Sequence, residues 1–192
     1  MPGDHADALA DAIRLESEAH RALLDGDADR AGERLRAAAE RYRASWELAP
    51  PRSFGRLIGM LKALVIAGDD DAARAAAAYT REQVSDVDAS PPAWYAIAIA
   101  ALVEGDDERA RRAAAGMRSG GDAFGRTADA IEALAGGDGA AYAAAAGAIV
   151  ADFEGRTEHL TGVPIADTAL MLERLAERRG LAARPASALL PG

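Results

Sequence analysis

The three histidines of the chain are the first residues to consider for acid–base or metal chemistry. His5, His20 and His159 are far apart, and none has a second histidine at the four-residue spacing that places two metal ligands on one helix face. There is no cysteine, so thiolate ligands and disulfide bonds are excluded. We therefore expect neither a metal ion nor any other cofactor.

Glu158 and His159 stand side by side in the longest predicted loop, about residues 154–162, and Asp167 follows soon after it. Loops held on a rigid scaffold often carry function, and a carboxylate with an imidazole is a usual pairing for proton transfer. If the three side chains converge in a pocket, they would form the site of a small-molecule hydrolase or lyase. Nothing in the sequence fixes their distances, so a solvated loop is the simpler interpretation, and we predict no catalytic residue.

Trp46, Trp94 and Tyr95 are the aromatic side chains best suited to hold a protein partner, because Trp and Tyr dominate interface hot spots. They stand at helical spacing among alanines, which favours packing inside the fold. Together with the three loop residues named above, they form the predicted set of partner-binding residues. The run Asp69–Asp71 would suit a divalent cation, but the dipole of a helix that begins there explains it more simply.

The chain carries a formal net charge of −9, from 22 Lys and Arg against 31 Asp and Glu. This balance disfavours nucleic acid and anionic membranes as partners, because their phosphates attract Lys and Arg. Lys62 is the only lysine. A GC-rich genome and a halophilic source would each produce this bias, and both stay open.

The longest apolar run, 93–103, is too short for a bilayer, which needs about 20 residues, so we expect a cytoplasmic protein.

Apolar residues recur at three- and four-residue steps along almost the whole chain, a pattern typical of amphipathic helices. Alanine dominates the apolar set and favours helices further, because it loses no side-chain entropy there. Glycine and proline interrupt the pattern at intervals. We predict nine helices, over about 4–25, 27–49, 53–67, from 69, 90–105, from 106, 122–134, 138–152 and 164–179.

A Gly-Asp pair recurs between consecutive predicted helices and defines four similar corners, at Gly26-Asp27, Gly68-Asp69, Gly105-Asp106 and Gly137-Asp138. Glycine suits the left-handed residue that ends a helix, and aspartate caps the helix that follows. Five positions after each glycine stand Ala31, Ala73, Ala110 and Tyr142. The alanine at three of these positions lets two helices approach closely, and the repeat predicts four helical hairpins.

This repeat resembles a degenerate tetratricopeptide repeat over about residues 10–150. The best matches to the spacing of that family are Trp94, Ala98, Gly105, Ala110 and Ala114 in one hairpin, and Gly26, Ala31, Leu35 and Ala38 in another. The intervals between corners are unequal, and the proline that usually closes each repeat is missing. The resemblance implies an array of irregular stacked hairpins that binds a protein or peptide.

The segment after Phe153 differs in character and consists of the loop, the last predicted helix and a proline-containing tail. We expect residues 1–152 to form the hairpin array and residues 153–192 to pack on the same domain. An all-helical, cysteine-free chain of this size with such a C-terminal helix also resembles the immunity protein 49 group of polymorphic toxin systems. That second resemblance implies a toxin domain as the partner.

The sequence thus predicts an all-α fold of antiparallel helical hairpins stacked as a short solenoid. Its expected function is non-enzymatic binding of a protein or peptide, and the net acidity favours a basic partner. Two alternatives remain, namely the hydrolase or lyase site near residues 154–167 and a structural or self-associating helical domain. The oligomeric state stays open.

Overall fold

The computed structural model describes residues 4–87 and 89–192, and in those ranges the chain forms helices, turns and loops without a strand. The helices are α1 (Asp4–Leu24), α2 (Ala28–Leu48), α3 (Gly55–Ile66), α4 (Asp70–Gln83), α5 (Pro91–Glu104), α6 (Asp107–Met117), the 3-10 helix η1 (Arg118–Gly120), α7 (Asp122–Gly136), α8 (Gly139–Glu154) and α9 (Asp167–Glu177). The prediction of an all-α fold of about nine helices is confirmed.

All four Gly-Asp corners have the predicted conformation. The φ angles are left-handed, at 78°, 70°, 79° and 71° for Gly26, Gly68, Gly105 and Gly137. At the third corner the Gly105 N–H donates to the Leu102 carbonyl at 3.3 Å, and the Asp106 N–H donates to the Ala101 carbonyl at 2.9 Å. The Asp106 carboxylate then accepts the N–H of Arg109 at 3.0 Å, and the other three corners repeat this cap. Local sequence therefore sets four chain reversals.

The helices of the array approach closely because small residues stand where they meet. Three of the four residues predicted at these contacts are small, namely Ala31, Ala73 and Ala110, and they are buried together with the fourth, Tyr142. Elsewhere a glycine accommodates an aromatic ring. A Cβ on Gly59 of α3 would lie 2.7 Å from the ring of Tyr42, and one on Gly116 of α6 would lie 2.5 Å from that of Trp94. Large side chains of one helix thus fill spaces that another helix leaves open.

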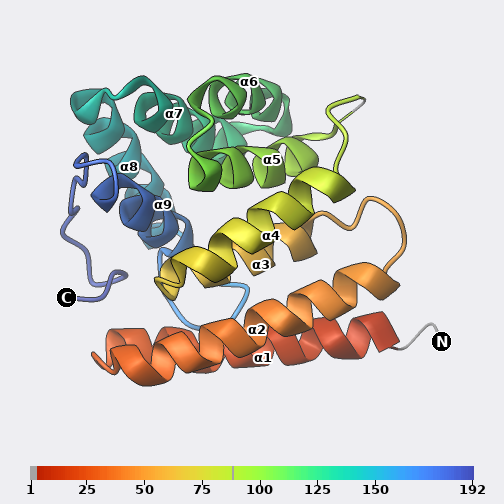
Figure 1. The fold of residues 1–192 in the computed structure, drawn as a ribbon. Coiled ribbons are helices and arrows are strands. Elements are labelled where there is room, and N and C mark those ends of the chain that lie inside the picture. The colour runs from red at the N-terminus through yellow and green to blue at the C-terminus, as the bar shows by residue number, and fades with distance from the viewer. Residues whose placement is uncertain (1–3, 88) are drawn as a thin grey trace.

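The hairpins stack so that each packs on the next (Figure 1). α1 lies along α2 at one end of the molecule, α2 packs on α3, α4 on α5, and α6 on α7. The first helices of successive hairpins also contact each other, α3 with α5 and α5 with α7. α9 packs on α3, α7 and α8. We call the side of the array on which α9 lies its inner side.

α9 begins at Asp167 and not at Pro164, so the prediction for the start of the last helix was wrong. The Ala166 N–H donates to the carbonyl of Leu189 in the C-terminal tail, at 2.8 Å. The backbone before Asp167 is therefore held by the tail and does not continue the helix. A contact between segments this far apart leaves no local signal in the sequence.

Glu173 of α9 holds the tail in place. This side chain is buried, and its carboxylate accepts the hydroxyl of Tyr142 at 2.6 Å. It also accepts the backbone N–H groups of Ala183 at 3.2 Å and Arg184 at 2.7 Å. Three donors on one buried carboxylate compensate for its lost hydration. Glu173 therefore joins α9 to Tyr142 of α8 and to the tail at residues 183–184.

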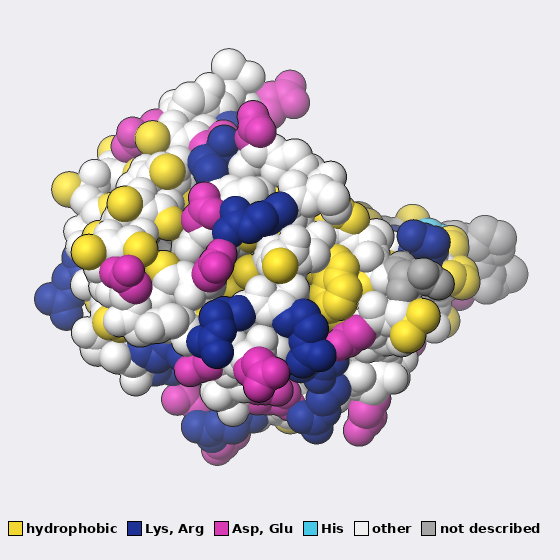
Figure 2. Space-filling view, turned by 90° about the horizontal axis from the view of Figure 1, so that it is seen from above, with side chains coloured by type: hydrophobic (Ala, Val, Ile, Leu, Met, Phe, Trp, Pro, Cys, Tyr) yellow, Lys and Arg dark blue, Asp and Glu magenta, His cyan; other side chains and the backbone are white. Residues whose placement is uncertain are grey.

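Basic and acidic side chains alternate over the face formed by α6 and α7, where no broad patch of one sign stands out (Figure 2). Arg118, for instance, pairs with Asp129 at 2.5 Å and with Glu132 at 2.6 Å. Exposed pairs of this kind contribute little to stability individually. None of the helices in the described ranges is long and apolar enough to cross a membrane.

Replacing Gly105 with alanine should lower the free energy of unfolding by about 1–2 kcal/mol, because a side chain in the left-handed region is strained. Gly147 in α8 provides a matched control, since a Cβ at either glycine would meet nothing within 4 Å. Gly147→Ala should raise stability by about 0.5–1 kcal/mol, because its backbone is helical. Urea unfolding measures both values, and equal effects would show that the corner does not require glycine.

Candidate functional site

The three aromatic residues predicted to bind a partner contribute to packing and do not share a surface. Trp46 is half-buried beside Phe54, with ring centroids 5.7 Å apart. Trp94 is half-buried against Gly116 of α6. Tyr95 is buried, with 8% of its surface exposed. The helical spacing of these residues therefore reflects packing between helices, as their position among alanines indicated.

The three predicted loop residues come together only in part. Glu158 is exposed, whereas His159 is half-buried and its Nδ1 is buried without a hydrogen-bond partner. His159 and Asp167 line one cavity of about 190 Å³ beneath the loop, and Glu158 is not part of its lining. The arrangement needed for a hydrolase or lyase made of all three side chains is thus incomplete.

Asp167 forms a buried ion pair with Lys62 of α3. Lys62 is 9% exposed, and its Nζ donates to Asp167 Oδ2 and, at 3.2 Å, to Thr168 Oγ1. Asp167 Oδ1 accepts the backbone N–H of Thr168 at 2.8 Å. Burial disfavours both charges, but their mutual attraction prevails, so the pKa of Lys62 lies above its ordinary value and that of Asp167 below it. Both groups are therefore charged at neutral pH.

Glu16 and His20 of α1 lie beside this ion pair. Tyr42 donates its hydroxyl to Glu16 Oε2 at 2.7 Å, and His20 Nδ1 lies 3.0 Å from Thr161 Oγ1. Burial, reinforced by the charge of Asp167, raises the pKa of Glu16 to about 7. Burial lowers the pKa of His20 to about 4. At neutral pH His20 is therefore uncharged, while Glu16 is near the midpoint of its titration.

These residues form what we call the central polar cluster, made of Glu16, His20, Tyr42, Lys62, Asp167 and Thr168. Of the six, the sequence prediction selected only Asp167. A signal was nevertheless present, because Lys62 is the only lysine and stands in α3, which is apolar apart from Arg56 in its first turn. Glu16 and His20 likewise continue the apolar stripe of Leu9 and Ile13 at helical spacing. Polar residues on an apolar face predict buried, partnered groups.

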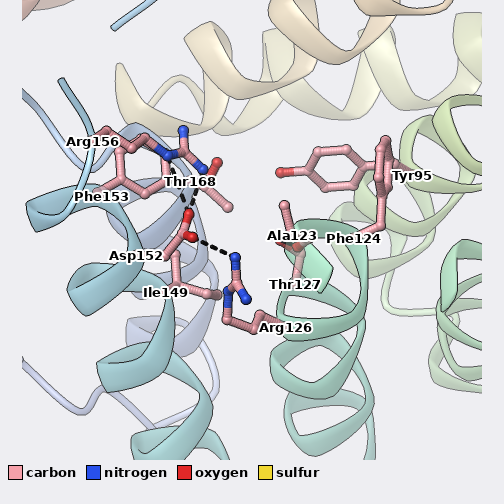
Figure 3. Close-up of a pocket in the computed structure, with 10 residues that line it drawn as sticks. All are labelled: Tyr95, Ala123, Phe124, Arg126, Thr127, Ile149, Asp152, Phe153, Arg156 and Thr168. Carbon is pink, nitrogen blue, oxygen red and sulfur yellow. Dashed lines mark hydrogen bonds and ion pairs between the residues drawn. The ribbon is translucent and has the colours of Figure 1, made fainter. Parts of the chain in front are cut away.

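Three openings adjoin the central polar cluster. The α1–α3 groove has a volume of about 240 Å³, and the loop cavity under residues 159–161 has about 190 Å³. The α7–α8 cavity, of about 130 Å³, lies between Tyr95 of α5, Arg126 of α7 and Arg156 after α8 (Figure 3). Sites for drug-sized ligands occupy roughly 300–1,000 Å³. Each opening therefore suits a single side chain or a small ligand.

The acidic residues that the sequence suggested for metal or proton chemistry are engaged in other contacts. In the part of the chain that the structure describes, no three His, Asp or Glu side chains are placed to hold a metal ion. Asp69, a residue of the acidic run, caps α4 and pairs with Arg36 at 2.9 Å. Asp167 has both oxygens engaged, so it is poorly placed to transfer a proton.

Comparison of the chain with known protein families, with curated proteins and with solved structures finds no match.

Replacing Lys62 with methionine should destabilise the protein by about 3–5 kcal/mol, because the buried Asp167 carboxylate would lose its counter-charge. The double variant Lys62→Met/Asp167→Asn should recover most of that loss, since neither site would then carry a charge. Urea unfolding of the wild type, both single variants and the double variant measures the coupling. A double variant no more stable than Lys62→Met would contradict a direct ion pair.

The pH dependence of stability should reveal Glu16. Its pKa rises from 4.5 to about 7 on folding, so the folded state holds this proton more tightly than the unfolded chain does. The resulting stabilisation is complete below pH 4.5 and is lost as pH rises to about 7. The difference in free energy of unfolding between Glu16→Gln and the wild type should therefore shift in favour of the variant by up to about 3 kcal/mol as pH rises from 4.5 to about 7.

Thermal unfolding at several pH values would measure this gain, with Glu158→Gln, at an exposed position, as the control. His20 changes stability in the opposite direction, because its lowered pKa makes the fold more stable as pH rises from about 4 to 6.5. The difference between variant and wild type at each pH removes that contribution. A constant difference over this range would show that Glu16 titrates normally.

Proposed function

We propose that this protein is a non-enzymatic interaction module that binds a segment of a partner protein at the α1–α3 groove. The observation that carries the proposal is the exposure of Leu160, which is 77% accessible and stands at the edge of that groove. The apolar part of the groove is formed by Leu9 and Ile13 of α1 and Ile58 of α3. The polar side chains in its lining are Glu16, Tyr42, Arg56, Lys62 and Asp167. An apolar side chain of a partner would contact the apolar part.

The loop that carries Leu160 is anchored, which supports a role as a preformed contact. The Gly162 N–H donates to the His159 carbonyl at 2.9 Å and closes a turn around Leu160. The ring of His159 lies 6.2 Å from that of Phe153, measured between centroids. Thr161 is held by the contact with His20 described above. An apolar side chain on a preformed turn requires little ordering of the backbone on binding and suits an interface anchor.

The charge of the chain indicates the kind of partner. At a net charge of −9 the protein attracts basic proteins and repels acidic ones. Glu158, next to the anchor, is exposed and available for such a contact. We therefore propose a basic partner, and a toxin domain neutralised by this chain is the version that the immunity-protein resemblance suggests.

The two alternatives gain less support. A hydrolase or lyase at the loop would need Glu158 to join His159 and Asp167, and Glu158 faces solvent while Asp167 is bound to Lys62. Self-association through the same groove remains a distinct outcome, which light scattering across protein concentrations would reveal.

The proposal predicts that Leu160→Glu abolishes partner binding without unfolding the protein. Val87 is a matched control, because it is also 77% exposed but lies between α4 and α5, away from the groove. Affinity capture from the source organism uses the wild type, Leu160→Glu and Val87→Glu as baits. The wild type and Val87→Glu should capture a protein that Leu160→Glu does not capture. Binding of that protein, once purified, should weaken as salt rises, because opposite charges attract.

Two results would overturn this function. One is an identical set of captured proteins for all three baits, since the groove would then play no part. The other is a captured protein whose affinity for the purified chain is the same with glutamate at position 160. Circular dichroism of both variants establishes that each remains folded.

A further inference from the structure

The α7–α8 cavity contains an arrangement of donors that the proposed protein contact does not use. Arg126 of α7 and Arg156, just after α8, both bind Asp152 of α8, which lies between them (Figure 3). Arg156 donates to Asp152 Oδ2 from Nη2 at 2.6 Å and from Nε at 3.1 Å. Two guanidinium groups thus share one carboxylate. The cavity keeps an excess of one positive charge, although the whole chain has a net charge of −9.

The guanidinium groups retain hydrogen-bond capacity after binding Asp152. Each arginine carries five N–H donors in a fixed plane. Arg126 uses Nη2 for Asp152, and Arg156 uses Nη2 and Nε. Both arginines line the cavity, and each keeps N–H groups that its contact with Asp152 does not use. Planar donors of this kind match the oxygens of a carboxylate or phosphate.

Tyr95 supplies a further donor from the opposite wall. Its hydroxyl points into the space between Thr168 and Arg126 (Figure 3). The hydroxyl oxygen is buried and makes no hydrogen bond of good geometry, although Thr168 lies beside it. Burial raises the pKa of Tyr95, so the group stays protonated and can donate. A buried hydroxyl without a partner is unfavourable, and such groups normally have one.

The rest of the cavity wall is apolar. Phe124, Ile149 and Phe153 contribute to the lining, and Phe124 meets the ring of Tyr95 edge-on at 6.2 Å between centroids. The volume of about 130 Å³ equals that of about four water molecules at roughly 30 Å³ each. This is the size of a carboxylate group with a short carbon substituent.

We propose that the α7–α8 cavity binds a small organic carboxylate, with its oxygens accepting hydrogen bonds from Tyr95, Arg126 and Arg156. The short carbon chain of the ligand contacts Phe124, Ile149 and Phe153. This site is separate from the α1–α3 groove, and none of its lining residues lines that groove. Failure of one proposal therefore leaves the other standing.

Titration of the isotope-labelled protein with butyrate, followed by NMR at constant ionic strength, tests the site. Butyrate should shift signals of residues around the cavity in a saturable way. Butyramide, which has the same shape without the charge, should not. Inorganic phosphate is the third probe, and binding of phosphate without butyrate would overturn the assignment to a carboxylate.

Tyr95→Phe is the decisive variant, because it removes one hydroxyl and leaves the ring. It should weaken butyrate binding about tenfold, which is the loss expected for one hydrogen bond to a charged group. Tyr79→Phe is the matched control, since the Tyr79 hydroxyl donates to Glu47 outside the cavity, at 3.2 Å. Arg126→Gln should abolish binding, with Arg118→Gln as its control at an exposed ion pair.

The proposal is wrong if butyrate produces no saturable shifts in the wild-type protein. It is equally wrong if Tyr95→Phe and Arg126→Gln both bind butyrate as the wild type does. Because Tyr95→Phe changes a single atom, it keeps the test valid even if Arg126→Gln unfolds.

Discussion

The buried ion pair between Lys62 and Asp167 is the contact on which the arrangement of the molecule depends. It joins residues 105 positions apart, linking the middle of α3 to the first residue of α9. Either charge alone would be strongly unfavourable in this interior, so α9 cannot leave the inner side without separating both. At the other end of α9, Arg178 pairs with Asp70 and Arg179 with Asp107, at the starts of α4 and α6. These ion pairs fix α9 and the two residues after it to three helices of two hairpins, namely α3, α4 and α6.

The parts of the fold that the sequence predicted are those determined by neighbouring residues. Each Gly-Asp corner encodes a left-handed residue and a helix cap within a few positions, so four reversals and most helix boundaries followed from local patterns. The position of α9 is different in kind. The last helix could pack beside the array or across its inner side. Its contact partners, such as Lys62, decide between the two, and they are too far away along the chain for a local sequence pattern to indicate the contact. The start of α9 was wrong for the same reason, since a tail residue, Leu189, binds the backbone of Ala166.

The candidate site was predicted only where residue type alone indicated function. His159 and Asp167 were selected as loop residues, and the structure does bring them to one cavity. Glu16, His20, Tyr42 and Lys62 were missed because each stands within a helical pattern that reads as packing. Their importance arises from the meeting of α1, α2, α3 and α9, which no single segment reveals. The available indications were a lone lysine among the apolar residues of α3 and two polar residues, Glu16 and His20, on the apolar stripe of α1. An unpaired charged group would not be buried at such positions.

The position of α9 also restricts how such an array can bind a partner. Helical hairpin arrays usually offer their inner side as an extended surface for a peptide. Here α9 and the loop before it occupy that side, and the uncovered part lies at the first hairpin, between α1 and α3. The α1–α3 groove and the loop cavity share Lys62, Leu160 and Asp167 in their linings. A segment seated in the groove would therefore contact the residues that hold α9, and its binding would be coupled to the stability of the whole C-terminal segment.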